Sequence, residues 1–267
     1  MRSLNGAELA GFIKERQAKA VRVLRQTLHV VPKLAIIRVN DDPAVDVYMR
    51  LKKRYGNDIL IDVDVHHIPQ AEAAGLIRHL NDDPSVHGII LQLPLSDPSE
   101  TESLINLIAP YKDVDGLGEE AIFDSATPMA VNWLIVGYNI ELTGKRILIV
   151  GNGRLVGAPL ARMWRNSGYD VTVVDKSTAD IRPSVRNADV VVTATGVPAL
   201  IKSDMLRPDT VVVDAGVASE DGKLVGDLEP AVRERHDLIM TPMKGGVGPL
   251  TVSALFDNVI RAAQGDS

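Results

Sequence analysis

The chain has 267 residues and a mass of 28.9 kDa, enough for one large domain or two of modest size. It carries 29 Lys and Arg against 35 Asp and Glu, a formal net charge of −6, which argues against a nucleic-acid-binding surface. Cysteine is absent, which excludes disulfides, a thiolate nucleophile and Cys-ligated zinc. Because no apolar run is long enough for a signal peptide or a membrane span, we expect a cytoplasmic protein with no membrane partner.

Apolar strand-like runs alternate with amphipathic segments, which is the pattern of α/β folds. In the first half we predict helices over 5–28, 43–56, 70–80 and 104–108, with strands over 33–39, 61–68 and 88–93. In the second half we predict helices over 128–138, 157–167 and 249–263, with strands over 146–150, 170–174, 190–194, 211–214 and 238–241.

The series divides near residue 120 into two α/β lobes, which we expect to flank a cleft. Residues 1–121 form the predicted N-terminal lobe, and the final helix, within 249–267, returns to complete it. Residues 122–248 form the predicted C-terminal lobe, a Rossmann-like dinucleotide-binding domain.

A glycine-rich segment, GNGRLVG over 151–157, follows the strand 146–150 and precedes a predicted helix. Glycines in this context let the backbone approach a pyrophosphate, and the helix N-terminus supplies unpaired N–H groups. The spacing is GxGxxxG and departs from the strict GxGxxG, so a plain strand-to-helix turn is the alternative.

Asp175 strengthens the dinucleotide interpretation because it closes the next strand, 175 − 151 = 24 residues beyond Gly151. An acid roughly 20 residues on bonds the adenosine ribose, and a carboxylate there repels a 2′-phosphate. This favours NAD over NADP, although Lys176 adds a positive charge next door. The predicted cofactor-binding residues are Gly151, Asn152, Gly153, Arg154, Leu155, Val156, Asp175, Lys176, Ser177, Thr195 and Gly196.

Other segments carry a resemblance to a known family. Tyr48 and Lys52 lie four apart, hence on one helix face. QLPL occupies 92–95, KDVDG occupies 112–116, and TPMKGGVGPLT occupies 241–251. In this order and spacing, from about residue 33 to 262, the chain resembles the bifunctional methylenetetrahydrofolate dehydrogenase/methenyltetrahydrofolate cyclohydrolase family.

The resemblance implies hydride transfer from 5,10-methylenetetrahydrofolate to NAD or NADP, followed by hydrolysis of the methenyl product to 10-formyltetrahydrofolate. It implies that Lys52 is central to the cyclohydrolase step, assisted by Tyr48 and Gln92, and that Asp115 holds the pteridine. The substrate-binding residues that it implies are Tyr48, Pro94, Asp115, Gly245, Gly248 and Pro249. Tetrahydrofolate derivatives are then the partners, and the chain is expected to form a homodimer.

The residue types suit this chemistry. An amine partly desolvated in a cleft has a lowered pKa and can exchange a proton with attacking water. Gln92 can orient the amine of Lys52, and Asp115 can accept hydrogen bonds from pterin N–H donors. Hydride transfer needs close alignment rather than a protein acid or base. We expect no metal site, since the pair His66 and His67 has no third ligand at a suitable spacing.

The sequence departs from the family at several positions. Val45 stands where the family commonly has a serine, so cyclohydrolase activity is less secure than dehydrogenase activity. Ala126 replaces the cysteine of the family's PCTP segment. The family's Arg-Ser pair in the glycine turn is Asn152-Gly153, and its His-Ser-Arg-Thr is Asp175-Lys176-Ser177-Thr178, which both disfavour NADP. The alternatives are a dehydrogenase-only member, the same lobes acting on another pterin or a shikimate-like hydroxy acid, and a non-catalytic nucleotide-binding sensor.

Overall fold

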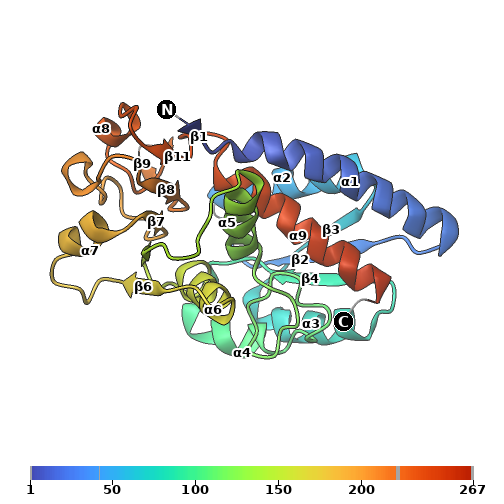
Figure 1. The fold of residues 1–267 in the computed structure, drawn as a ribbon. Coiled ribbons are helices and arrows are strands. Elements are labelled where there is room, and N and C mark those ends of the chain that lie inside the picture. Colours follow the sequence, from blue (N-terminus) through green and yellow to red (C-terminus); the bar gives the residue numbers. More distant parts are fainter. Residues whose placement is uncertain (1, 42, 221–222, 266–267) are drawn as a thin grey trace. The chain divides into compact units, whose positions relative to one another are not determined.

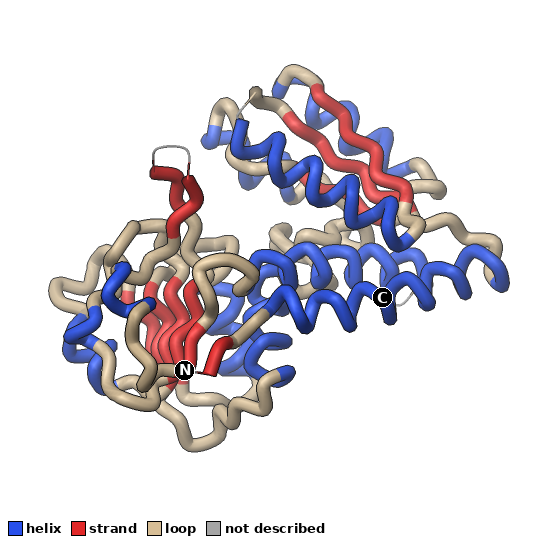
Figure 2. Tube along the Cα trace, turned by 90° about the horizontal axis from the view of Figure 1, so that it is seen from above, coloured by secondary structure: helices blue, strands red, loops and turns tan. Residues whose placement is uncertain are grey.

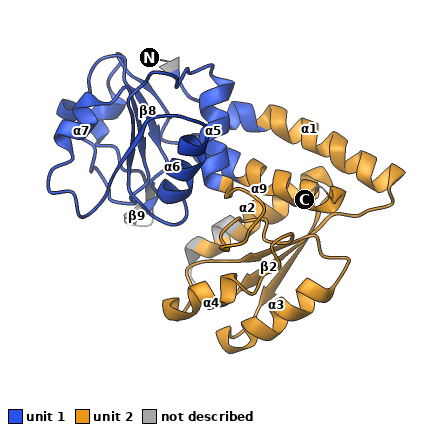
Figure 3. Ribbon diagram, turned by 60° about the horizontal axis from the view of Figure 1, so that its bottom comes forward, with its two compact units in different colours: residues 1–10, 127–251 blue, residues 11–126, 252–267 orange. Residues whose placement is uncertain are grey.

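The protein is described here by a computed structural model that covers residues 2–41, 43–220 and 223–265. It divides into two compact units (Figures 1 and 3). The N-terminal unit comprises residues 11–126 and 252–267, and the C-terminal unit comprises residues 1–10 and 127–251. The first ten residues group with the C-terminal unit because β1 (Arg2–Ser3) pairs in parallel with β11 (Ile239–Met240). The predicted division at 121/122 and 248/249 did not include this pairing.

The N-terminal unit contains a three-stranded parallel sheet in the order β3 (Asp62–His67), β2 (Lys33–Arg38), β4 (Gly88–Leu91). The four inner residues of the central strand β2 are buried, as expected in a parallel sheet whose two faces are both covered. The helices of this unit are α1 (Gly6–Thr27, from Gly11 on), α2 (Pro43–Ile59), α3 (Ala73–Asp82) and α4 (Thr101–Ile105), with 3-10 turns η1 (Gln70–Glu72) and η2 (Pro98–Glu100).

The last helix, α9 (Val247–Gln264), adds its residues from 252 on to the N-terminal unit, as predicted. The Tyr55 ring of α2 stacks on the Phe256 ring of α9, with centroids 5.0 Å apart. The Tyr55 hydroxyl donates to Gln17 Oε1 at 2.8 Å, and Gln17 Nε2 donates to Ser253 O at 2.8 Å. This partly buried polar cluster joins α1, α2 and α9, and α2 is the helix that carries Lys52.

The C-terminal unit contains a six-stranded parallel sheet in the order β1-β11-β8-β7-β5-β6. Figure 2 shows strands in red side by side within this unit. Its remaining strands are β5 (Ile147–Val150), β6 (Val171–Val174), β7 (Val190–Thr193) and β8 (Val211–Asp214). Its helices are α5 (Ala126–Gly137), α6 (Gly157–Asn166), α7 (Arg182–Asn187) and α8 (Pro230–Arg233), with a 3-10 turn η3 (Ser203–Met205). All four residues of β5 and of β7 are buried.

The strand order creates a switch point beside β5. β6 pairs on one side of β5, and the chain then returns so that β7 pairs on the other side. In open parallel sheets the crevice at the carboxyl ends of the strands beside such a reversal is the usual ligand site. The segments after β5 and β7 begin with Gly151 and Ala194, so the predicted glycine loop occupies this place.

Several short elements were not predicted. β9 (Ala218–Glu220) and β10 (Lys223–Val225) form an antiparallel pair, and the Asp-Gly pair in the sequence between them is a hairpin signal that the prediction did not use. α7 and β1 are too short for their hydrophobic period to show. Within the described ranges, no helix combines the length and apolar character needed to cross a membrane.

Candidate functional site

Lys52 and Gln92 meet at the carboxyl end of β4 in the N-terminal unit. Lys52 Nζ donates a hydrogen bond to Gln92 Oε1 at 3.0 Å. Gln92 directly follows β4, and its Nε2 donates to Leu93 O at 2.8 Å, which leaves the amide oxygen for the lysine. Desolvation lowers the pKa of the Lys52 amine below the usual lysine range, against an opposing attraction from Asp115. Such an amine exchanges its proton at a lower pH than a free lysine does.

Asp115 lies within electrostatic range of Lys52. Burial raises the pKa of the Asp115 carboxyl, and the Lys52 ammonium partly offsets this by favouring the carboxylate. The two groups therefore share one partly desolvated environment, in which each stabilises the charge of the other. The structure thus brings together three of the four predicted catalytic residues, Lys52, Gln92 and Asp115.

The KDVDG segment places Asp115 by means of its own first two residues. Asp113 is buried, and its carboxylate accepts backbone N–H groups from Gly116 at 3.1 Å, Leu117 at 3.1 Å and Gly118 at 2.7 Å. Gly116 has φ +66°, and a Cβ there would lie 2.5 Å from Phe123 O. The loop therefore needs a glycine directly after Asp115 and a carboxylate two residues before it.

Lys112 anchors the same segment to helix α3. Its buried Nζ donates to three carbonyl oxygens at the end of that helix, Leu80 O at 2.9 Å, Asn81 O at 2.8 Å and Asp83 O at 2.7 Å. A cation at a helix C-terminus satisfies carbonyl groups that have no partner within the helix. Lys112 is thus engaged in contacts that hold the fold together.

Replacing Lys112 by Met is expected to lower the free energy of unfolding by about 3 kcal/mol, because three buried or partly buried carbonyls lose their donor while the stem still packs. The measurement is urea unfolding followed by circular dichroism. Lys19 on α1 is exposed, and Lys19→Met is the matched control. Equal unfolding free energies for the two variants would show that the three hydrogen bonds add no net stability.

The other predicted residues of this unit are placed as follows. Tyr48 belongs to α2, but its side chain lies outside the part of the chain that the structure describes. Val45, one turn earlier, is buried and offers no hydrogen-bonding group. Pro94 follows Leu93 through a cis peptide bond, and its carbonyl accepts a hydrogen bond from the Asn40 amide.

Gly245, Gly248 and Pro249, the predicted substrate residues near the C-terminus, belong to the C-terminal unit. Gly245 has φ +81°, and its carbonyl accepts the Ala7 N–H at 2.9 Å. At Gly248 a Cβ would meet no described atom within 4 Å, and Pro249 lies in the first turn of α9. A positive φ accounts for the glycine at 245, whereas neither a positive φ nor crowding accounts for the one at 248.

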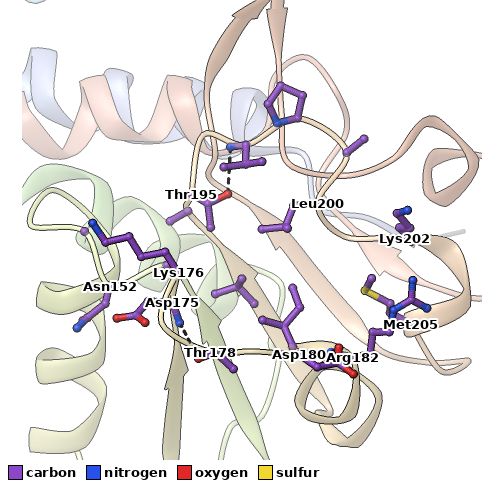
Figure 4. Close-up of a pocket in the computed structure, with 18 of the residues that line it drawn as sticks. Asn152, Asp175, Lys176, Thr178, Asp180, Arg182, Thr195, Leu200, Lys202 and Met205 are labelled. Carbon is purple, nitrogen blue, oxygen red and sulfur yellow. Dashed lines mark hydrogen bonds between the residues drawn. The ribbon is translucent and has the colours of Figure 1, made fainter.

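A cavity of about 930 Å³ opens at the switch point of the C-terminal unit (Figure 4). Six of the predicted cofactor residues line it: Gly151, Asn152, Gly153, Asp175, Lys176 and Thr195. The other five, Arg154, Leu155, Val156, Ser177 and Gly196, are next to lining residues or within three positions of them but do not line the cavity. Figure 4 shows Asn152, Asp175 and Lys176 toward one end, and Arg182, Lys202 and Met205 toward the other.

The glycines of the turn let neighbouring backbone segments lie close to it. Gly151 has φ +105°, and a Cβ there would lie 2.6 Å from Ala194 O. A Cβ at Gly157 would lie 1.8 Å from Gly151 O, so the third glycine lets the start of α6 pack on the turn. The spacing GxGxxxG therefore keeps the functions of the strict fingerprint, an open turn and close helix packing.

Asp175 is held by its own loop. Its Oδ1 accepts the Ser177 N–H at 2.9 Å and the Ser177 hydroxyl at 2.6 Å. These hydrogen bonds lower the pKa of the Asp175 carboxyl, so it is ionised at neutral pH. The cavity therefore has a fixed negative charge, and Lys176 beside it contributes a positive charge.

Sequence reasoning missed about two thirds of the residues that line the cavity, 13 of 19. The lining residues that it did not name are Val150, Thr178, Ala179, Asp180, Ile181, Arg182, Ala194, Val197, Pro198, Ala199, Leu200, Lys202 and Met205. Most follow β6 or β7, so extending the prediction along both loops would have found them. Among the residues that the structure describes, no group of three or more His, Asp or Glu side chains is placed to hold a metal ion.

Comparison with known proteins gives one family over almost the whole chain. Residues 4–115 match the family described as "Tetrahydrofolate dehydrogenase/cyclohydrolase, catalytic domain", and residues 125–267 match its "NAD(P)-binding domain". "Bifunctional protein FolD" of Exiguobacterium sibiricum is 38% identical over 275 residues, covering 98% of this chain and 99% of that protein.

Two solved structures extend the likeness to the fold. The bifunctional FolD methylenetetrahydrofolate dehydrogenase/cyclohydrolase of Campylobacter jejuni is 35% identical, with a TM-score of 0.94 and 100% of both chains covered. The Trypanosoma brucei FolD enzyme, complexed with NADP cofactor and inhibitor, is 28% identical, with a TM-score of 0.91 over 99% of this chain and 97% of that chain. The predicted fold of two parallel-sheet α/β domains is confirmed, and the chain belongs to the tetrahydrofolate dehydrogenase/cyclohydrolase family.

Proposed function

We propose that this chain oxidises 5,10-methylenetetrahydrofolate to 5,10-methenyltetrahydrofolate, passing the hydride to NAD(P), and then hydrolyses that product to 10-formyltetrahydrofolate. The observation that carries the proposal is the Lys52 amine, lowered in pKa and hydrogen-bonded to Gln92 at 3.0 Å. The likeness to bifunctional relatives over the full chain supports the same two activities.

In the hydrolytic step, water adds to the methenyl carbon and the bond from that carbon to N5 breaks. The water loses both of its protons as its oxygen becomes the formyl oxygen: N5 gains one and the other is released to solvent. Lys52, in its neutral form, takes the first proton from the water as the new C–O bond forms. Gln92 Oε1 orients the amine, and Asp115 binds the N–H donors of the pterin.

In the oxidative step a nicotinamide cofactor held by the residues that line the cavity of the C-terminal unit would supply the hydride acceptor, and the protein would align the two reactants. The C-terminal unit fits a dinucleotide because two of the three turn residues that line the cavity are glycines, which place no side chain in it. Gly151 and Gly153 both line that cavity, at the place where a pyrophosphate would meet the N-terminus of α6.

Within this function we propose that NAD is preferred over NADP. Asp175 presents an ionised carboxylate to the cavity, where it can accept hydrogen bonds from ribose hydroxyls and repels a 2′-phosphate. The arginine that the resemblance leads us to expect in this loop is replaced by Ser177, which instead orients Asp175. We also propose a homodimeric, cytoplasmic enzyme, for which light scattering should give twice the 28.9 kDa of one chain.

A coupled rate assay tests the function. Purified protein is supplied with 5,10-methylenetetrahydrofolate and either NAD or NADP, while reduced nicotinamide and the methenyl product are followed together. We expect reduced cofactor to form, faster with NAD, without build-up of the methenyl compound. Build-up that decays at the spontaneous rate would indicate a dehydrogenase alone and would implicate Val45. No turnover with either cofactor would favour another substrate or a nucleotide sensor.

A further inference from the structure

Asp227 is a carboxylate with no exposed surface, in the loop between β10 and α8 of the C-terminal unit. Its Oδ2 accepts the hydroxyl of Thr193 at 2.5 Å and the backbone N–H of Thr195 at 2.8 Å. Burying a carboxylate is costly unless hydrogen bonds replace its hydration. One donor, Thr193, is the last residue of β7, and the other, Thr195, lies in the segment that follows this strand.

That segment forms one wall of the cavity at the switch point. Ala194, Thr195 and Val197 line the cavity, whereas Asp227 does not. Thr195 continues the connection, because its Oγ1 accepts the Val197 N–H at 3.1 Å, a bond drawn in Figure 4. Asp227 therefore acts on the wall from behind, through the backbone of Thr195.

A second carboxylate fixes the backbone of Asp227 in turn. Asp214, the last residue of β8, has a buried side chain whose Oδ1 accepts the Asp227 N–H at 3.1 Å. Asp214 Oδ2 pairs with the Arg233 guanidinium, and Arg233 Nη1 donates to Thr241 O at 2.7 Å. The charge of Asp214 is thus balanced by a cation, and the backbone N–H of Asp227 is held at the carboxyl end of β8.

Two glycines make room for these carboxylates. A Cβ at Gly216 would lie 2.0 Å from Asp227 Oδ1, and a Cβ at Gly226 would lie 2.1 Å from Asp214 Oδ2. Asp227 Oδ1, facing Gly216, has no hydrogen-bond donor among the described residues. A buried carboxylate with one oxygen left unsatisfied is a poor contributor to stability, so its position calls for another explanation.

We propose that Asp227 is a positioning residue for the cofactor, which holds residues 194–197 so that they form the wall against which the dinucleotide lies. The inference rests on the proposed function, because it takes the occupant of the cavity to be NAD(P). The proposal concerns a residue that does not line the cavity, and a substitution of this residue should change the affinity for the cofactor. A group that orients binding residues from behind affects binding by fixing their geometry.

The test compares Asp227→Ala, Asp227→Asn, Gly216→Ala and the double variant Gly216→Ala/Asp227→Ala. Dissociation constants for NADH and NADPH are measured by fluorescence titration, and KM is measured separately for cofactor and folate. Asp227→Ala is expected to weaken NADH binding about tenfold, the effect of losing a charged hydrogen bond. Asp227→Asn should stay within about threefold of wild type, since its amide oxygen still accepts the Thr195 N–H. The folate KM should change less than the cofactor KM in every variant.

Gly216→Ala is the most direct test, because it leaves Asp227 in place while its added methyl group would push the Asp227 carboxylate away from Thr195. Asp227→Ala removes the three atoms nearest to that methyl group, so the double variant should bind NADH no more weakly than Asp227→Ala alone. The inference would be overturned if the two substitutions weakened NADH binding independently, so that their factors multiplied in the double variant. Unchanged NADH binding by Asp227→Ala would also overturn it. If thermal melting shows that Asp227→Ala does not fold, Gly216→Ala decides: weaker NADH binding supports the inference and unchanged binding overturns it.

The same titration separates the two proposals. A wild-type chain that binds neither NADH nor NADPH would defeat the proposed function and the inference with it. Wild-type binding that Gly216→Ala and Asp227→Ala leave unchanged would defeat the inference alone.

Discussion

Replacing Lys52 by Met is expected to lower the cyclohydrolase rate at least about a hundredfold, the usual contribution of a positioned general base. Methionine keeps most of the stem of the side chain but removes the amine that Gln92 orients. The dehydrogenase reaction needs no protein base, so it should keep most of its rate. Methenyltetrahydrofolate should then accumulate when the variant oxidises the methylene compound.

The control for Lys52→Met is Lys53→Met, which changes the exposed neighbouring lysine on the same helix. A second variant, Lys52→Arg, keeps the positive charge but cannot lose its proton near neutral pH, so it should be as slow as Lys52→Met. Hydrolysis of supplied methenyltetrahydrofolate is followed directly, against the spontaneous rate without enzyme. Full cyclohydrolase activity in Lys52→Met would remove Lys52 from the mechanism and leave the dehydrogenase-only hypothesis standing.

The pH dependence of the hydrolysis follows from the same site. A base works when it is unprotonated, so the cyclohydrolase rate should rise with pH as Lys52 loses its proton. Because desolvation lowers the pKa of Lys52, that rise should be centred below the usual lysine range. The Asp115 carboxylate raises the pKa of Lys52, so Asp115→Asn should move the rise to lower pH. A profile that moves to higher pH in this variant would contradict the assignment.

The long elements of both units were predictable because their hydrophobic patterns are unambiguous. The strand predicted over 146–150 corresponds to β5, four fully buried residues, and the helix predicted over 5–28 corresponds to α1. The strand predicted over 88–93 ends sooner, since β4 stops at Leu91 and the chain then turns away through Pro94, which has no N–H to donate. The pairing of β1 with β11 joins residues more than 230 positions apart, and a local pattern carries no information about such contacts.

The candidate site was predictable where residue types recur in a known order, and less so where its structure depends on tertiary contacts. Lys52 and Gln92 were both named from the resemblance, and their hydrogen bond agrees with the orienting role predicted for Gln92. The anchoring of Lys112 on the end of α3 joins residues about 30 positions apart and was not foreseen. Asp227 was missed for the same reason, because its partners lie more than 30 residues away in a separate strand and loop.

Replacing Asp175 by Asn is expected to shift the ratio of kcat/KM values at least about tenfold from NAD toward NADP. Two negative groups a few ångströms apart near a protein surface repel by a few kcal/mol, and the variant removes one of them. Asparagine keeps the shape of the side chain, and its amide oxygen can still accept the hydrogen bonds from Ser177. The substitution therefore tests the effect of the negative charge while the conformation of the loop is kept.

The matched control is Asp180→Asn, since Asp180 lines the same cavity and its loss changes the net charge equally. If overall charge decided the preference, both variants would shift the ratio alike, whereas contact with the ribose predicts a large shift for Asp175→Asn only. Ser177→Ala gives a third arm, because it removes the hydroxyl that orients Asp175 and leaves the charge in place. Weaker NAD binding without a gain for NADP in that variant would separate orientation of the carboxylate from repulsion by it. A wild-type preference for NADP, retained in Asp175→Asn, would instead assign the 2′-phosphate to Lys176, the cation beside Asp175 in the cavity.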